Sequence, residues 1–408
     1  MILRRSVLGM LAGGAGIVAS GAWARSKPPR IGVVGAGIVG ASIACHLAEA
    51  GAQVTVFDRT GPAAGATRNS FAWINAFVAD ANYRDLRLQS LLAYHDLDRR
   101  LGLGIVWGGY LNWAHDAAHA GIVRTNAGQL AGSPFPVQWL NAAQVAALSP
   151  HLTPGPVEAA IYSAIDGHLD PVGVTERFLA TARSHGAQLR YPCELTGIDF
   201  RHGRLIGVAT KQGFVSLDRL VVAAGVDTPR LIALCGFTLR LRHAPGILAH
   251  SKPVPELTRI IHDGPGELSF KQMASGSIVG TDSPEPPDLP VHAGIRAQPL
   301  DFPDAALRDL HGNRILAKVM SLLPDARGAE LEWLSLGFRP MPMDDLPVVG
   351  SVPGVAGVHV AVTHSGVTLA PILGRCVTAE LLDGSRLPTL ERYRPERFIP
   401  TEPRSSAA

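Results

Sequence analysis

The feature that most constrains this fold is a strand-helix-strand unit near the start of the chain. A short apolar, β-branched run over residues 31–34 leads into glycines at 35, 37 and 40, in the spacing Gly-x-Gly-x-x-Gly. An Ala-rich helical segment follows and stops at Gly51, and a second apolar strand ends at Asp58. Strand, glycine turn, helix and terminal acid together predict a βαβ unit of the kind that binds a dinucleotide.

Each part of this unit has a physical reason. Gly35 permits the tight turn, Gly37 lets the backbone approach a pyrophosphate, and Gly40 lets the helix pack close to the strand. The free N–H groups at the start of the helix then face the phosphates. Asp58 lies 18 residues after Gly40, close to the spacing of ~20 expected for an acid that accepts a hydrogen bond from a ribose hydroxyl. A merely structural glycine-rich turn is the alternative.

Composition narrows the class of protein further. A length of 408 residues allows two domains, or one large domain with an insertion. With 47% hydrophobic and 17% charged residues, the chain can bury a large core. The formal charge of +3, without a dense basic stripe, excludes nucleic acid as an expected partner. The four cysteines are far apart and lack zinc-ligand spacing, so we expect isolated buried thiols and no metal site.

Residues 1–24 have the pattern of an export signal. Arg4 and Arg5 precede a Gly/Ala-rich apolar run, and Ala22-Trp23-Ala24 has the small-x-small form of a cleavage site. The twin arginines indicate Tat-type export of a folded protein, which predicts a periplasmic or secreted location. An uncleaved anchor is the alternative. No later segment has the ~20 apolar residues of a membrane-spanning helix.

Five further segments carry a family pattern. They are residues 65–73 (GATRNSFAW), 166–171 (DGHLDP), 220–231 (LVVAAGVDTPRL), 338–350 (FRPMPMDDLPVVG) and 358–371 (VHVAVTHSGVTLAP). In this order they resemble the D-amino acid oxidase family of FAD-dependent flavoproteins, which includes glycine oxidase, sarcosine oxidase, D-amino acid dehydrogenase and dimethylglycine dehydrogenase. The resemblance extends over about residues 29–398.

The resemblance implies an α/β fold in which an α+β antiparallel-sheet substrate domain is inserted into a Rossmann-like FAD-binding domain. The FAD-binding domain would comprise residues 29–81, 150–236 and 334–398, and the substrate domain residues 82–149 and 237–333. Residues 399–408 would form a flexible tail.

The resemblance also implies which residues hold FAD. They are Gly35, Ala36, Gly37, Ile38, Val39 and Gly40 in the glycine turn; Asp58 and Arg59; Ala66, Thr67 and Ser70 in a loop under the flavin ring; Leu195, Ala224 and Gly225; and Ser365, Gly366, Val367, Thr368 and Leu369. Leu195 would contact the adenine side through its backbone. The last group would open a helix whose N–H groups face the C2 carbonyl and N1, where reduced flavin is negative.

Two residues are candidates for the substrate side. Arg339 stands where glycine oxidase-like enzymes have the arginine that pairs with the substrate carboxylate, a task suited to a bidentate, always-charged donor. A surface ion pair with Asp344 or Asp345 is the alternative. His364 directly precedes the flavin-facing helix, so it would touch substrate, tune the flavin or serve a structural role. His168 is expected to brace its loop.

Two departures from the family pattern predict a noncovalent FAD. Sarcosine oxidases attach flavin through a cysteine where this chain has Gly337, and dimethylglycine dehydrogenases through a histidine where it has Asn69. Glycine oxidases also have an arginine between the histidine and glycine of the last motif, where this chain has only Ser365. That difference removes a second carboxylate contact and argues against a glycine-like substrate.

The expected function is that of an exported FAD-dependent oxidoreductase acting on the C–N bond of an amino acid or secondary amine. A D-amino acid or an N-alkylated or cyclic amino acid would transfer hydride to flavin N5, and the imine would then hydrolyse. Oxygen or a respiratory-chain acceptor would reoxidise the flavin. Two alternatives stay open: oxidation of a hydroxy acid C–O bond, and a flavin-binding subunit without turnover.

Overall fold

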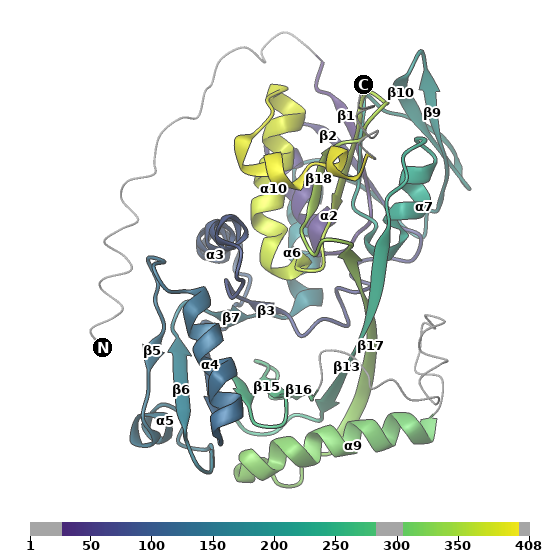
Figure 1. Cartoon of the computed structure of the whole chain (residues 1–408). Coiled ribbons are helices and arrows are strands. Elements are labelled where there is room, and N and C mark those ends of the chain that lie inside the picture. The colour runs from purple at the N-terminus through teal and green to yellow at the C-terminus, as the bar shows by residue number, and fades with distance from the viewer. Residues whose placement is uncertain (1–26, 283–304, 400–408) are drawn as a thin grey trace, which may run out of the picture.

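The computed structural model describes residues 27–282 and 305–399 and is shown in Figure 1. The predicted export signal lies outside the described residues, and so does the predicted tail beyond Ile399. Residues 283–304 of the predicted substrate domain lie outside them as well. In the described part of the chain, no helix is long and apolar enough to cross a membrane.

The first half of the architecture is a six-stranded sheet with the strand order β18-β19-β12-β1-β2-β8. Its strands are β1 (Arg30–Val34), β2 (Gln53–Phe57), β8 (Gln188–Arg190), β12 (Arg219–Val222), β18 (Val348–Ser351) and β19 (Val358–Val362). All neighbours pair in parallel except β18, which is antiparallel to β19. Since β1 lies between β2 and β12, the glycine turn that follows it is at the centre of the sheet's carboxyl edge, where parallel sheets bind ligands.

Four helices cover one face of this sheet. They are α2 (Ile38–Glu49), α3 (Ala81–Leu101), α6 (Pro171–Ser184) and α10 (Gly366–Asp383). Helix α2 packs between α6 and α10, and α3 packs against α10 (Figure 1). Small residues such as Ala41 and Ala44, both fully buried, let α2 approach its neighbours closely. The predicted βαβ unit is therefore present and is the best-buried part of the domain.

A second layer covers the opposite face of the six-stranded sheet. It consists of the three-stranded sheet β9 (Leu195–Arg201), β10 (Arg204–Thr210) and β11 (Gly213–Ser216), together with α7 (Thr228–Ala233). Successive residues of a strand point to opposite faces. Val33 accordingly packs among the helices, whereas Val34 packs with Leu205 of the small sheet and Ile232 of α7.

The second half of the architecture is an eight-stranded sheet with the order β17-β13-β16-β15-β14-β4-β6-β5. Its strands are β4 (Tyr110–Ala114), β5 (Gln138–Trp139), β6 (Ala159–Ser163), β13 (Leu241–Ser251), β14 (Ile261–Gly264), β15 (Leu268–Gln272), β16 (Ile278–Thr281) and β17 (Leu331–Pro342). Helix α9 (Ala305–Leu322) covers one face of this eight-stranded sheet. Its side chains Ile315 and Val319 pack against Gly280 of β16, where the absence of a side chain leaves room for them. The long pair β13 and β17 runs from this sheet up to the first domain (Figure 1).

The remaining elements connect or flank these layers. They are α4 (Ala117–Gln129) and α5 (Ala142–Leu148) beside the eight-stranded sheet, the short pair β3 (Trp73–Ile74) and β7 (Gly167–His168), and the 3₁₀ turns Gly225–Asp227, Pro324–Ala326, Pro388–Tyr393 and Pro395–Phe398.

Three elements fall outside the domain boundaries expected from the sequence. Helix α3 belongs to the predicted substrate segment, yet its apolar side chains join the core of the six-stranded sheet and its helices. Strand β6 and the part of β17 from residue 334 onward have the opposite outcome. Both belong to predicted FAD-binding segments, yet β6 pairs with β4 and β17 pairs with β13 in the eight-stranded sheet. Local periodicity predicts a buried face but not the partner of that face, which is why the expected boundaries differ.

All four cysteines are buried and free. Burial raises the pKa of the Cys45 thiol to about 12 and that of Cys376 to about 11. Thiols held in the protonated form are poor nucleophiles, so these residues act as core packing. Within the described ranges, no group of three or more His, Cys, Asp or Glu side chains is arranged to hold a metal ion.

Candidate functional site

The glycine turn after β1 forms a cradle with no room for side chains at two of its positions. A Cβ on Gly35 would lie 2.3 Å from the carbonyl oxygen of Ala223, and one on Gly40 would lie 2.0 Å from that of Gly35. Gly35 also has a φ of 109°, which favours glycine. A Cβ on Gly37 would meet the hydroxyl of Thr67 at 3.1 Å, and that same hydroxyl accepts a hydrogen bond from the Ile38 N–H. The turn thus brings Thr67 of the predicted flavin loop to the start of α2.

Asp58 at the end of β2 braces the rim of this cradle. Its carboxylate accepts hydrogen bonds from the backbone N–H groups of Ala36, Thr60 and Gly61, at 2.8, 2.8 and 2.9 Å. The neighbouring Arg59 forms an ion pair with Asp227, at 2.7 Å. Asp58 therefore holds the backbone of the glycine turn in place, in addition to the ribose contact expected from the sequence.

Asp227 lies just past the end of β12, so the Arg59 ion pair connects the segments that follow β2 and β12, the two strands on either side of β1. Between the end of β12 and Asp227, the residues Ala224 and Gly225 turn the chain into a short 3₁₀ segment, with a φ of 56° at Gly225. Leu195, predicted to contact FAD through its backbone, begins β9. Its side chain is buried in the core between the six-stranded and the three-stranded sheet.

The predicted flavin loop, residues 65–72, lies between β2 and β3 and reaches the edge strand β17 of the eight-stranded sheet. Ala66, Thr67, Asn69 and Ser70 are half-buried in it, and the Ser70 hydroxyl accepts from the N–H of Ala72 at 2.9 Å. A Cβ on Gly337 of β17 would lie 2.6 Å from the Cβ of Asn69. The two positions singled out in the sequence for covalent flavin attachment in other family members are therefore neighbours in space.

The start of α10 meets the start of α2. A Cβ on Gly366 would lie 3.1 Å from the Val39 side chain, and the Ser42 hydroxyl donates to the carbonyl of Ala370 at 2.7 Å. Thr368 in the first turn of α10 donates its hydroxyl to the carbonyl of Trp73, just after the flavin loop, at 3.1 Å. The first-turn N–H groups of a helix have no intrahelical partner. Two helix N-termini, each suited to negative charge, thus converge beside one loop.

Helix α3 fixes the start of α10 from the other side. Ser365, Val367 and Leu369 lie in or next to the first turn, and the Leu369 N–H closes onto the Ser365 carbonyl at 3.0 Å. The Arg87 guanidinium donates to the hydroxyl of Ser365, and the Tyr94 hydroxyl donates to the carbonyl of Val367 at 2.5 Å.

Arg339 and His364, the two predicted substrate residues, belong to one electrostatic environment. His364 comes directly before α10, and Arg339 lies on β17 two residues past Gly337, on the same face of the strand. Burial, together with the positive charges of Arg87 and Arg339, lowers the pKa of His364 to about 4. His364 is therefore neutral near pH 7, and its Nδ1 is buried without a hydrogen-bond partner.

The acids that could have tied Arg339 to the surface have other partners. Asp344 forms an ion pair with Arg397 at 2.7 Å, and Asp345 forms one with Arg242.

Sequence analysis named the segment 166–168 but assigned its bracing role to His168, whereas the structure gives that role to Asp166. Asp166 accepts from the Trp73 indole at 2.6 Å and from the hydroxyl of Ser163. Burial raises the pKa of Asp166 to about 7, against the opposing effect of those hydrogen bonds. His168 is buried with neither ring nitrogen hydrogen-bonded.

Lys271 is a buried amine that sequence analysis missed. It lies on β15, with its Nζ 5.2 Å from the centre of the Phe71 ring in the flavin loop and with no hydrogen-bond partner. Burial lowers the pKa of Lys271 to about 7. No sequence signal marks it, since a lysine in an alternating strand is expected to face solvent.

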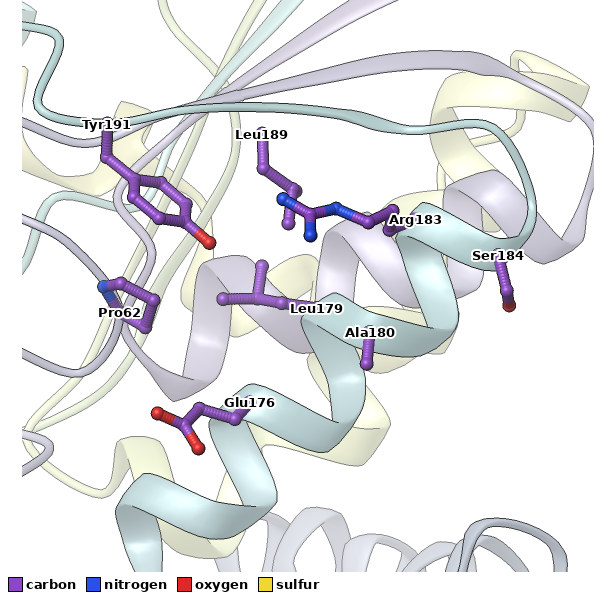
Figure 2. Close-up of a pocket in the computed structure, with 8 residues that line it drawn as sticks. All are labelled: Pro62, Glu176, Leu179, Ala180, Arg183, Ser184, Leu189 and Tyr191. Carbon is purple, nitrogen blue, oxygen red and sulfur yellow. The ribbon is translucent and has the colours of Figure 1, made fainter.

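A separate surface pocket of 410 Å³ lies between α6 and β8 (Figure 2). Leu179 and Arg183 of α6 face Leu189 and Tyr191 across it. None of its lining residues belongs to the predicted site, so this pocket is distinct from the glycine cradle.

These features fit a flavin dinucleotide. The cradle at residues 35–40 excludes side chains where a pyrophosphate would approach, and its helix start provides N–H donors. The start of α10, with the Arg87 guanidinium bound to Ser365, provides a second electropositive end next to the loop 65–72. A dinucleotide with one diphosphate and one electron-accepting ring is the group whose charges match both ends.

Comparison with known proteins identifies the class. The model of the family described as DAO, FAD dependent oxidoreductase, matches residues 30–380. The chain belongs to this family and is an FAD-dependent oxidoreductase.

The individual relatives of this chain share only about a quarter of its residues. Glycine oxidase from Geobacillus kaustophilus is 26% identical over 367 residues, covering 86% of this chain and 92% of that enzyme. Mitochondrial dimethylglycine dehydrogenase from Mus musculus is 25% identical over 380 residues, covering 90% of this chain but 44% of that protein. This chain therefore spans less than half the length of the dimethylglycine dehydrogenase.

Solved structures confirm the predicted fold class. L-proline dehydrogenase from P. horikoshii superposes with a TM-score of 0.78 at 21% identity, covering 91% of this chain and 98% of that one. The structure of Geobacillus kaustophilus glycine oxidase gives a TM-score of 0.77 at 24% identity, with coverage of 91% and 100%. At these identities the likeness establishes the fold.

Proposed function

We propose that this protein oxidises the C–N bond of a small amino acid or secondary amine that carries a carboxylate. D-amino acids and N-alkylated or cyclic amino acids are the proposed substrate classes. Several relatives carry names of this kind, including glycine oxidase and 4-methylaminobutanoate oxidase, and one structural neighbour is an iminodiacetate oxidase.

The observation that carries the proposal is the pairing of a guanidinium with a neutral imidazole beside the start of α10. His364 directly precedes α10, and Arg339 lies on β17 two residues after Gly337, which is next to Asn69 of the flavin loop. Burial, with a smaller contribution from the charges of Arg87 and Arg339, lowers the pKa of His364 and keeps its ring neutral. A fixed cation and an uncharged ring nitrogen are what an amino acid with a free carboxylate and a reacting amine requires.

The proposed chemistry assigns a separate task to each residue. FAD held at this site would supply the hydride acceptor for the hydrogen on the substrate's α-carbon. Arg339 holds the carboxylate and so orients the C–H bond. His364 stays neutral, and Nδ1 can accept a hydrogen bond from the substrate amine when the ring proton is on Nε2. The amine nitrogen loses a proton as the C=N bond forms, and water then adds to the imine to give a carbonyl compound and a free amine.

We also propose that FAD is held without a covalent bond. Asn69 and Gly337 occupy the two neighbouring positions where the resemblance implies attachment in other family members, and neither side chain can form such a bond. The cradle of residues 35–40 and the start of α10 would then provide all of the binding energy.

Export to the periplasm through the Tat route is a further part of the proposal. Its support is the sequence of residues 1–24, with Arg4 and Arg5 ahead of an apolar run. A periplasmic enzyme has access to oxygen and to acceptors of the respiratory chain, and we propose that one of these takes up the electrons. Fractionation of cells that express the full chain, with Arg4→Lys/Arg5→Lys as the control, tests the location: a wild-type protein found only in the cytoplasm would refute it.

The substrate class is tested by matched pairs under anaerobic conditions. The holoprotein is mixed with D- and L-alanine, D- and L-proline or sarcosine, and separately with D- and L-lactate, and the flavin absorbance is followed. The proposal predicts bleaching by at least one amine and none by the hydroxy acids. Bleaching by a hydroxy acid alone would replace the proposal with C–O oxidation, and no bleaching by either class would support a subunit without turnover.

A further inference from the structure

Arg87 of helix α3 is a buried cation whose partners are all neutral. Its side chain is 5% exposed. The guanidinium donates to the Asn75 side-chain oxygen at 2.7 Å and to the Ser365 hydroxyl, and it lies 4.8 Å from the centre of the Tyr83 ring. Among the residues that the structure describes, no carboxylate lies within ion-pair distance of Arg87.

Arginine stays protonated in proteins, so the Arg87 guanidinium keeps its positive charge although it is buried. A buried charge without a counterion is costly, so such residues are normally paired with an acid or with a bound anion. The carboxyl that responds to Arg87 is Asp166, but it is already hydrogen-bonded to Trp73 and Ser163. Asp166 therefore does not pair with Arg87, and a negative charge that develops near Arg87 would be stabilised by it.

The position of Arg87 indicates where such a negative charge would be stabilised. Ser365 is the residue that precedes the first turn of α10, so the Arg87 charge adds to the positive end of that helix. Two further α3 side chains hold the same helix: the Ser90 hydroxyl accepts from the Ile372 N–H at 3.4 Å, and Tyr94 donates to Val367. Arg87, Ser90 and Tyr94 are three and four residues apart and thus share one face of α3. These three contacts between α3 and α10 fix the Arg87 charge at the start of α10.

We propose that Arg87 is a positioning residue that holds Ser365 and places a fixed positive charge behind the start of α10, where it favours the negative charge of reduced flavin. The inference rests on the proposed function, in which this helix start faces the flavin. Hydride transfer brings two electrons and one proton to the flavin, so its reduced form carries one negative charge more than the oxidised form. A nearby cation therefore makes the bound flavin easier to reduce.

A purely structural role for Arg87 is the competing explanation, and Arg84 provides the matched control. Arg84 lies one turn earlier on α3 and donates to the carbonyl of Gln129 at 2.6 Å, away from α10. The charges that shift the pKa of His364 include Arg87 but not Arg84. Loss of either arginine removes a cation and a hydrogen bond from α3, but only loss of Arg87 removes charge from the α10 start.

The test is the two-electron midpoint potential of bound FAD, measured by anaerobic reductive titration of the holoprotein. We expect Arg87→Met to lower the equilibrium constant for flavin reduction by tenfold or more, a shift of about 30 mV. Arg84→Met should leave the potential unchanged. Arg87→Lys, which keeps the charge, should change the equilibrium constant by less than threefold. An Arg87→Met protein with full FAD content and the wild-type potential would overturn the inference, as would equal shifts in Arg84→Met.

If Arg87→Met does not fold or does not retain FAD, the variants Arg87→Lys and Ser365→Ala test the inference instead. Ser365→Ala breaks the contact to Arg87 and keeps the charge, so a smaller downward shift supports a positioned charge, and no shift contradicts it. The potential is measured without substrate. A protein that holds FAD, shows these shifts and oxidises no amine would refute the proposed substrate class and leave the Arg87 inference intact.

Discussion

The carbonyl of Val367 provides a sharp test of how the α10 start is held. Pro371 lies inside α10 and has no N–H, so it cannot donate to the carbonyl four residues earlier, which is that of Val367. The Tyr94 hydroxyl donates to this carbonyl instead, at 2.5 Å, and Tyr94 is fully buried. Tyr94 thus replaces a missing helix hydrogen bond directly beside the flavin-facing turn.

The structure sets the expected size of the effect. Tyr94→Phe removes the donor and keeps the ring, leaving a buried carbonyl unsatisfied, which costs about 1–3 kcal/mol. Tyr83→Phe is the matched control, because the Tyr83 hydroxyl is buried on the same helix and has no hydrogen-bond partner. Its removal should cost nothing or stabilise the protein slightly.

A double-mutant cycle isolates the hydrogen bond. Pro371→Ala supplies the N–H that the helix lacks, so Tyr94→Phe should cost less than about 1 kcal/mol in that background. The measurement is the free energy of unfolding in urea at saturating FAD, followed by circular dichroism. Equal costs for Tyr94→Phe and Tyr83→Phe would refute the assignment, and so would a Tyr94→Phe cost that is the same with Pro371 and with Ala at that position.

Three other predictions follow from the site. Gly37→Val should abolish FAD retention through gel filtration, because its side chain would fill the phosphate cradle beside Thr67; a yellow variant would argue against the cradle. Arg339→Ala should raise KM by about 10- to 100-fold, equivalent to about 1–3 kcal/mol, with FAD still bound; an unchanged KM would remove Arg339 from the substrate site. The folded-state pKa of His364 is lowered from 6.5 to about 4, so its contribution to stability is complete above pH 6.5 and is lost as the pH falls toward 4. His364→Asn should therefore lose less stability than wild type between pH 7 and pH 5, and equal losses in urea unfolding would contradict this.

The sequence predicts the parts of the site that depend on local chemistry. The glycine turn and the acid at the end of β2 follow from short-range rules about turns and helix termini, whereas the helix that starts after Ser365 is implied by the family resemblance. All three are found where expected. The fold class followed from family motifs and is confirmed by the solved structures.

What the sequence could not predict depends on contacts between distant segments. Arg87 reads as one of several arginines on an amphipathic helix, and its significance follows only from Ser365, 278 residues away. A single arginine at the spacing of the buried residues of α3 was the available signal, but long basic side chains at such positions commonly reach solvent. Likewise, the five residues of β6 do not indicate which sheet the strand joins.

The central claim is that one FAD lies, without a covalent bond, between the α2 and α10 helix starts. Its most direct test is to denature the purified full chain, remove the precipitate and measure flavin in both fractions. The account predicts one FAD per chain in the supernatant and none in the precipitate. A colourless protein, or flavin that stays with the polypeptide, would contradict it.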